Sequence, residues 1–142
     1  MLYLVLSYSF SQRMKLILST IFLLLATFAV AQAPKCSDFK NGKFVIRNAE
    51  TGNSYIEREG DRQLEYGEGS GLRLSFEINW IDNCTYTLTK MKVLANPEGF
   101  SIPANLEFTI KIIEVKENAY IQETHTNLFE KVLTSEVQRV EE

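Results

Sequence analysis

Two cysteines and a single histidine are the residues of this 142-residue chain best suited to do chemistry. Cys36 and Cys84 could form a disulfide, stay as free thiols or bind a metal. Two thiols and His125 fall short of the four ligands of a structural zinc site, so a metal is the weakest of the three. We expect the disulfide Cys36–Cys84, because an even pair of cysteines in an exported chain is most simply paired. A Cys–His nucleophile is then excluded, since it needs a free thiolate.

The other polar groups do not predict catalysis. A Ser–His–Asp triad would have to use His125, which we expect on the solvent side of its strand, and no serine stands in a G-x-S-x-G turn. Glu57, Glu65 and Glu77 could supply a glycosidase pair, but acidic residues that alternate along a strand are ordinarily exposed. The segment 67–71 resembles a phosphate loop only in its glycines, so we expect a hairpin loop. We predict no catalytic residue, no metal and no cofactor.

Aromatic side chains point instead to binding. Phe76, Trp80, Tyr86 and Phe108 fall on the inward-facing positions of neighbouring strands. A barrel lined with such rings can hold a small apolar ligand, although the simpler alternative is that the rings fill the core. The predicted function is a non-catalytic binding protein. The alternative is a structural or protein-interaction module of the cell envelope, with an exposed apolar patch on the loop 97–103. The sequence does not predict an oligomeric state.

The elements that position these residues are strands. Leu72–Trp80 alternates apolar and polar residues strictly, which is typical of a half-buried strand. The segments 84–88 and 106–112 repeat the pattern. The phase slips near Lys90 and at Ile112-Ile113, where we expect bulges or a change of partner.

Further strands are expected at residues 43–48, 54–59, 62–66 and 119–126, with an irregular loop at 96–103. Residues 132–140 could form a strand or a helix, and we favour the strand because the sheet needs a closing partner. Short connections predict sequential antiparallel pairing. The fold class is therefore all-β, a meander of seven or eight strands forming a small up-and-down barrel or a strongly curled sheet.

The N-terminus predicts export. The pair Met14-Lys15 precedes the 15-residue apolar run 16–30, and Ala29-Val30-Ala31 ends it as a signal-peptide cleavage site would. The run is shorter than the roughly 20 residues that span a bilayer, and an uncleaved anchor is the alternative. We expect an N-terminal extension plus signal peptide at 1–31, with Met1 or Met14 as the start, and a single β domain at 32–142. The predicted location is periplasmic or secreted.

Charge restricts the partners. Residues 1–31 hold two basic residues and no acidic one, so 13 basic residues face 18 acidic ones in the mature chain, a formal charge of −5. Nucleic-acid binding relies on basic patches and is not expected. Outward positions would place Arg73, Glu77 and Lys111 in mid-strand, so we expect no membrane span in the mature form. A small apolar ligand or an envelope protein is the predicted partner.

Two resemblances accompany these patterns. The run 36–44, with Ile56-Glu57-Arg58, Gln63-Leu64-Glu65 and Trp80-x3-Cys84-x-Tyr86-x-Leu88, resembles small exported proteins of flavobacteria-like bacteria that are often mislabelled "DNA topoisomerase IV". That label conflicts with the export signal and the acidic composition. Gly42-Lys43-Phe44 and Arg139 are similar to the Gly-x-Trp motif and closing arginine of lipocalin-like barrels, with Phe44 in place of tryptophan. This second resemblance implies a ligand-binding barrel.

Overall fold

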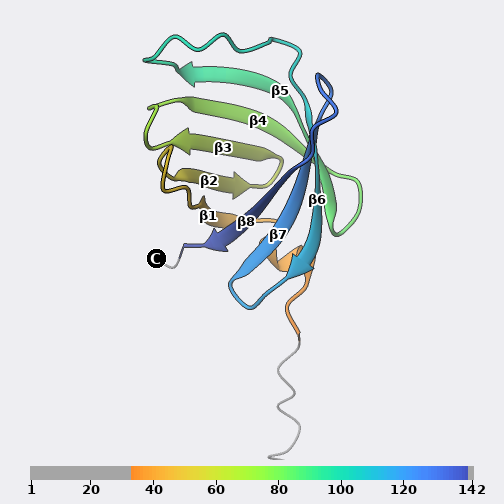
Figure 1. Ribbon diagram of the computed structural model, residues 1–142. Helices are drawn as coiled ribbons and strands as arrows, with labels where there is room; N and C mark the ends of the chain where they lie inside the picture. The colour runs from red at the N-terminus through yellow and green to blue at the C-terminus, as the bar shows by residue number, and fades with distance from the viewer. Residues whose placement is uncertain (1–32, 141–142) are drawn as a thin grey trace, which may run out of the picture. The chain divides into compact units, whose positions relative to one another are not determined.

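The computed structural model describes residues 33–140, so the predicted N-terminal extension and signal peptide lie outside the described residues. These described residues form a short 3-10 helix, η2, and eight strands that close into an antiparallel barrel in sequence order (Figure 1). The elements are η2 (Cys36–Phe39), β1 (Gly42–Ile46), β2 (Ser54–Glu59), β3 (Arg62–Gly67), β4 (Arg73–Trp80), β5 (Thr85–Ala95), β6 (Phe108–Val115), β7 (Ala119–Thr126) and β8 (Leu133–Arg139). The predicted all-β, up-and-down barrel is confirmed. Among residues 33–140, no helix has the length and apolar character needed to cross a bilayer.

Alternating burial explains why these segments are strands. In β4, Phe76 and Ile78 are buried while Arg73, Glu77 and Asn79 are exposed. The C-terminal segment is the expected strand, and β8 closes the barrel by pairing with both β7 and β1. Residues 68–72 form the expected hairpin loop between β3 and β4.

Bulges lie near the two positions where the alternation of apolar and polar residues changes phase, as predicted. Ser75 pairs with Lys92 but Glu77 pairs with Thr89, so β5 carries an extra residue there, and Lys90 has a φ of 50°. A second irregularity lies between Ile112 and Glu114. Bulges bend and twist a strand, which helps a small sheet to close on itself.

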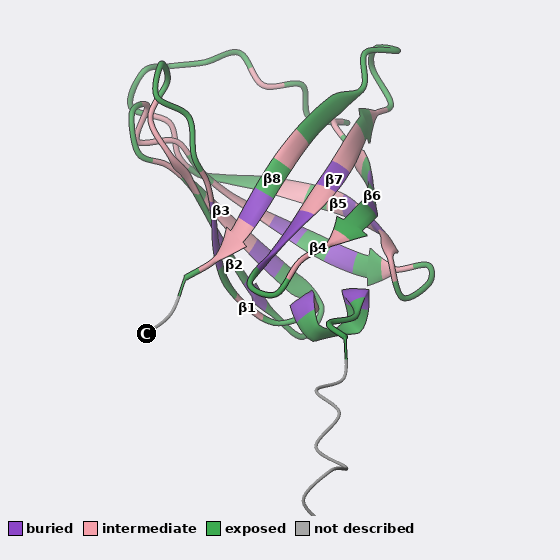
Figure 2. Ribbon diagram, turned by 60° about the horizontal axis from the view of Figure 1, so that its bottom comes forward, coloured by how far each residue is buried: buried purple, intermediate pink, exposed green. Residues whose placement is uncertain are grey.

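The two ends of the barrel differ (Figure 2). Because the strands alternate in direction, one end carries the connections 47–53, 68–72, 96–107 and 127–132, and the other carries only short turns and η2. We call these the open end and the closed end. Several exposed apolar side chains lie in the loops of the open end and at the adjoining start of β8: Phe100, Leu128, Phe129, Val132 and Leu133.

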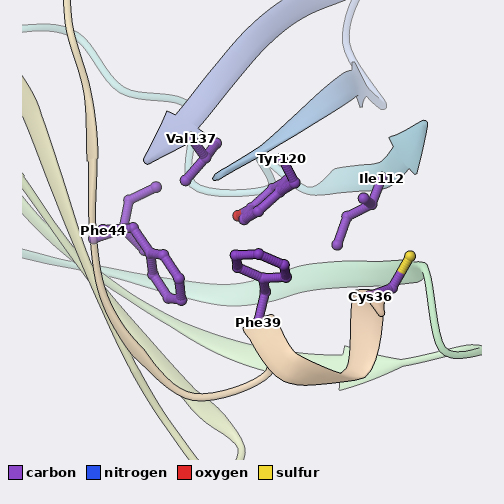
Figure 3. Close-up of a cluster of buried hydrophobic side chains, with 7 residues drawn as sticks. Cys36, Phe39, Phe44, Ile112, Tyr120 and Val137 are labelled. Atoms are coloured by element: carbon purple, nitrogen blue, oxygen red, sulfur yellow. The ribbon is translucent and has the colours of Figure 1, made fainter. Parts of the chain in front are cut away.

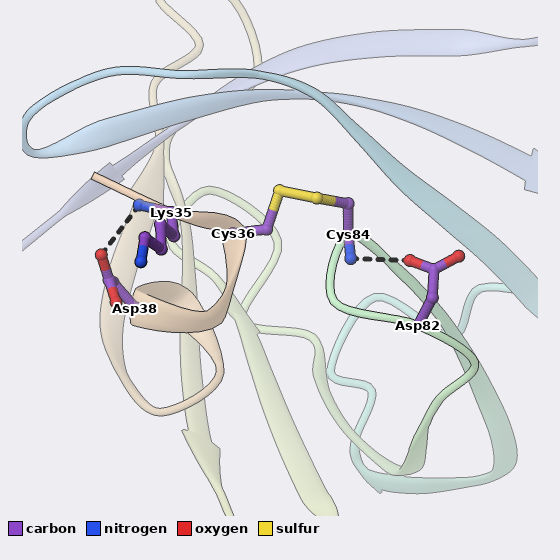
Figure 4. The surroundings of a disulfide bond; sticks show 5 residues. All are labelled: Lys35, Cys36, Asp38, Asp82 and Cys84. Carbon is purple, nitrogen blue, oxygen red and sulfur yellow. Dashed lines mark hydrogen bonds between the residues drawn. A yellow bond between two sulfur atoms is a disulfide. The ribbon is translucent and has the colours of Figure 1, made fainter. Parts of the chain in front are cut away.

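The predicted disulfide joins Cys36 and Cys84, and it ties η2 to the turn before β5 (Figure 4). The backbone N–H of Lys35 donates to Asp38 Oδ2 at 2.8 Å and closes the helix start. The backbone N–H of Cys84 donates to Asp82 Oδ1 at 2.7 Å, which lowers the pKa of the Asp82 carboxyl. Both sides of the covalent link are therefore held by local hydrogen bonds.

An aromatic cluster closes this end of the barrel (Figure 3). Phe39 of η2 lies edge-on to Tyr120, with 5.0 Å between ring centroids, and both rings are buried against Phe44. Arg139 spans the outside, with its Cζ 5.1 Å from the Phe44 ring centroid and 5.2 Å from that of Phe39. Its guanidinium donates to the carbonyl oxygens of Asp38 and Asn41, so it clamps η2 and the residues before β1 onto β8.

Gly42 is required at the start of β1 by its backbone conformation, and it lies beside the same clamp. Its φ is +129°, and an added Cβ would lie 2.6 Å from Arg139 Nη1. We expect Gly42→Ala to lower the free energy of unfolding by about 1–3 kcal/mol, because it adds backbone strain and displaces the clamp. Chemical denaturation measures this. The matched control is Gly60→Ala, which has a φ of +61° but nothing within 4 Å of its added Cβ. Equal losses in the two variants would show that the clamp contributes nothing.

Candidate functional site

A cavity of about 180 Å³ lies inside the barrel toward its open end. Three of its lining residues are the terminal residues of strands at that end: Ile46 of β1, Phe108 of β6 and Leu133 of β8. The full lining has an apolar part and a polar part: Ile46, Ile56, Leu88, Phe108, Ile110 and Leu133, and then Gln63, Glu65, Tyr86, Gln122, Thr124 and Ser135. An apolar wall with a few polar groups is typical of a small-molecule site.

The cavity's polar side rests on a buried arginine. Arg58 is only 2% exposed, and it contacts two of the lining residues. Its Nε donates to Gln63 Oε1 at 2.7 Å, Nη1 donates to the Phe39 carbonyl oxygen at 3.0 Å, and Nη2 donates to the hydroxyls of Tyr86 and Tyr120. The same side chain therefore joins the closed-end aromatic cluster to the cavity.

Aromatic faces surround the charge of Arg58. Its Cζ lies 4.7 Å from the ring centroid of Tyr86, 5.0 Å from that of Phe44 and 5.6 Å from that of Tyr120. Burial alone would lower the pKa of Arg58, but Tyr86, Tyr120 and Glu65 outweigh it and the pKa is raised. For the two tyrosines, in contrast, burial raises the pKa, so their hydroxyls stay protonated. Arg58 is thus a permanent buried cation within a hydrogen-bonded network.

Glu65 is the carboxylate nearest to this network. Gln63 bridges the Arg58 guanidinium and the Glu65 carboxyl group, because its Oε1 accepts from Arg58 and its Nε2 donates to Glu65 Oε1 at 2.6 Å. Burial raises the pKa of Glu65, while the hydrogen bond from Gln63 and the charge of Arg58 act in the opposite direction. On the other side, Tyr86 Oη donates to Gln122 Oε1 at 3.2 Å.

The predicted ligand residues are only partly brought together at this cavity. Tyr86 and Phe108 line it, whereas Phe76 and Trp80 do not. Phe76 is buried behind Phe108, with 5.8 Å between ring centroids, and Trp80 packs on Tyr86 at 4.5 Å. Among the described residues, the Trp80 indole N–H is the one buried side-chain polar atom without a hydrogen-bond partner. Both of these rings support the wall from behind.

Apart from Tyr86, the polar lining of the cavity was not among the predicted site residues. Glu65 was expected on an exposed strand face, but it faces the interior, whereas Glu57, Glu77 and His125 are exposed. The tight turn at Gly60-Asp61 carries the signal that locates Glu65. It pairs Arg58 with Gln63 and Ile56 with Glu65, so an inward Ile56 places Glu65 inward as well.

A second, larger hollow of about 390 Å³ lies over β2 and β3. We call it the outer groove. It is lined by the stacked pair Tyr55 and Tyr66 together with Leu64, Leu94 and other residues. Tyr55, Tyr66 and Leu94 are themselves exposed, so a ligand here would be covered on one side only. The interior cavity buries a small molecule more completely and is the better candidate site.

Within residues 33–140, no group of three or more His, Cys, Asp or Glu side chains is placed to hold a metal ion. No protein-family model matches the sequence, and neither a curated protein nor a solved structure matches it significantly.

Proposed function

We propose that this chain is an exported, non-catalytic binding protein that holds a small, largely apolar molecule inside its barrel. The observation that carries the proposal is the interior cavity of about 180 Å³, with its apolar wall and hydrogen-bonded polar side. Sites for drug-sized ligands measure roughly 300–1,000 Å³. The molecule, or the part of it that enters the barrel, is therefore small.

Two further observations support this proposal. Arg139 packs over Phe44 and clamps η2 across the closed end, in keeping with the proposed likeness to lipocalin-like barrels. The Cys36–Cys84 disulfide favours an oxidising compartment, so export to the periplasm or beyond is part of the proposal.

A mouth-blocking variant tests the site. Leu133 lines the cavity and is 44% exposed, so Leu133→Trp should fill the mouth without disturbing the buried core. We expect wild type to bind n-hexanol saturably, seen as changes in the fluorescence of Trp80, the chain's single tryptophan. Leu133→Trp should bind at least about tenfold more weakly, because the apolar area available to the probe is lost.

Thr134→Trp is the matched control. Thr134 is the next residue of β8 and is exposed, so its side chain points to the other face of the strand. Since both variants add a tryptophan, methyl NMR shifts of Leu88 and Ile110 replace fluorescence as their readout. Hexanol binding that survives Leu133→Trp unchanged would overturn the interior site.

A second candidate function, contact with an envelope protein, rests on the outer groove. Native mass spectrometry of protein purified from its own compartment separates the two candidates. A retained small molecule that Leu133→Trp removes supports the interior site. A retained protein that Leu94→Lys removes supports the outer groove, since Leu94 is 57% exposed and lines it.

A further inference from the structure

We propose that the interior cavity is selective for a small amphiphile with a cationic, hydrogen-bond-donating head, an alkylamine in first place, and that the Glu65 carboxylate binds this head. The inference rests on the proposed function, because it uses the same cavity. It adds the chemical class of the ligand.

Of the described residues that line the cavity, Glu65 is the only ionisable acid or base apart from the neutral tyrosine Tyr86. Arg58 lies behind Gln63 and Tyr86 and is 2% exposed. Its guanidinium donates to four protein acceptors, so it is not presented to a ligand. A head group that enters the barrel can therefore contact the Glu65 carboxylate directly, whereas Gln63 and Tyr86 separate it from the Arg58 cation.

The hydrogen bonds already made within the lining indicate which kind of head group the cavity can bind. Gln63 uses its carbonyl oxygen on Arg58 and its amide nitrogen on Glu65. Gln122 uses its carbonyl oxygen on Tyr86 and its amide nitrogen on Thr124. Glu65 accepts through Oε1 from Gln63. A carboxylate has two oxygens, so an ionised Glu65 can accept further hydrogen bonds from a ligand and donates none.

Electrostatics disfavour the opposite head. A fatty-acid carboxylate in the cavity would face Glu65, and an ionised Glu65 would repel it. An ammonium head would form a charge-assisted hydrogen bond with Glu65, which is worth roughly twice a neutral one. An alcohol can donate to the same oxygen without the charge. The expected order of affinity is amine, then alcohol, then carboxylate.

Proton linkage supports the same assignment. Because burial raises the pKa of Glu65, the native state holds that proton more tightly than the unfolded chain does. The stability from Glu65 is therefore full below its unfolded pKa and is lost as pH rises through its folded pKa. Ionisation of Glu65 therefore costs the native state stability, as is common for a residue kept for binding. Glu65→Gln should unfold at higher denaturant than wild type at neutral pH, with the difference shrinking toward about pH 4.

The experiment compares n-hexylamine, n-hexanol and hexanoate, which share one tail, by calorimetric titration near neutral pH. Wild type should bind hexylamine about tenfold or more tighter than hexanol, and hexanoate most weakly. Glu65→Gln should lose the preference for the amine and keep hexanol binding, which also shows that the variant is folded. Glu59→Gln is the matched control, because Glu59 is an exposed acid of β2, the strand that pairs with β3, and it should behave as wild type. The affinity of wild type for hexylamine should fall as pH falls through the raised pKa of Glu65, while that for hexanol should not.

The outcomes separate the two proposals. Failure of all three probes to bind would overturn the binding site itself. Hexanol binding with equal or tighter hexanoate binding, or an amine preference that survives Glu65→Gln, would overturn the inferred head group and leave the interior site standing.

Discussion

Arg58→Ala is expected to lower the free energy of unfolding by about 3–5 kcal/mol, the range seen when one partner of a buried charged network is removed. The guanidinium donates to Gln63, the Phe39 carbonyl and two tyrosine hydroxyls. Each orphaned buried acceptor costs about 1–3 kcal/mol, and the truncated side chain leaves a cavity as well. Removal of a buried charge offsets part of this loss, so the contributions do not simply add.

Urea denaturation of three variants checks this result. Arg62→Ala, an exposed arginine of the same hairpin, should change stability by no more than about 0.5 kcal/mol. Arg58→Lys keeps the charge but has three donors instead of five, so it should fall between wild type and Arg58→Ala. If Arg58→Ala is as stable as Arg62→Ala, the network does not hold the barrel together.

Loss of the disulfide is the second large effect. The cysteines are 48 residues apart, and closing a loop of that length is worth about 4 kcal/mol in the chain-entropy model. We expect Cys36→Ala/Cys84→Ala to lose about that much stability. Since a domain of this size has roughly 5–15 kcal/mol in total, the loss is a large share of it.

The disulfide prediction has a structural control. In the entropic account the bond acts on the unfolded chain, so the native packing of Phe39 against Tyr120 should survive the double substitution. Denaturation curves measure the loss, and near-UV circular dichroism reports on the aromatic packing. An unchanged unfolding free energy in the double variant would contradict the prediction. So would reduction of the wild-type disulfide, if it cost clearly less unfolding free energy than the predicted loss.

Much of the fold could be predicted from period-two alternation. The pattern located β4, β5 and β6, and its slips at Lys90 and Ile112-Ile113 correctly marked two bulges. A further irregularity at Leu94 was missed, because only one of the two phase changes in β5 shows in the apolar pattern. The disulfide was predictable from cysteine count and compartment.

The polar side of the site was harder to predict because alternation assumes that apolar residues face inward. In β3 this assumption fails: Leu64 and Tyr66 line the outer groove, while Gln63 and Glu65 line the interior cavity, Glu65 contributing to the outer groove as well. Arg58 follows the phase of Ile56, yet an arginine in mid-strand normally indicates exposure. Only the register set by the Gly60-Asp61 turn places these three polar residues inside.

The central claim is that a small amphiphile binds inside the barrel above Arg58 with its head on Glu65. Intermolecular nuclear Overhauser effects in the complex with n-hexylamine test it most directly. We predict contacts from the alkyl tail to the methyl groups of Leu88, Ile110 and Leu133, which line the cavity. Contacts to Leu64 and Leu94 alone would place the ligand in the outer groove and contradict the account.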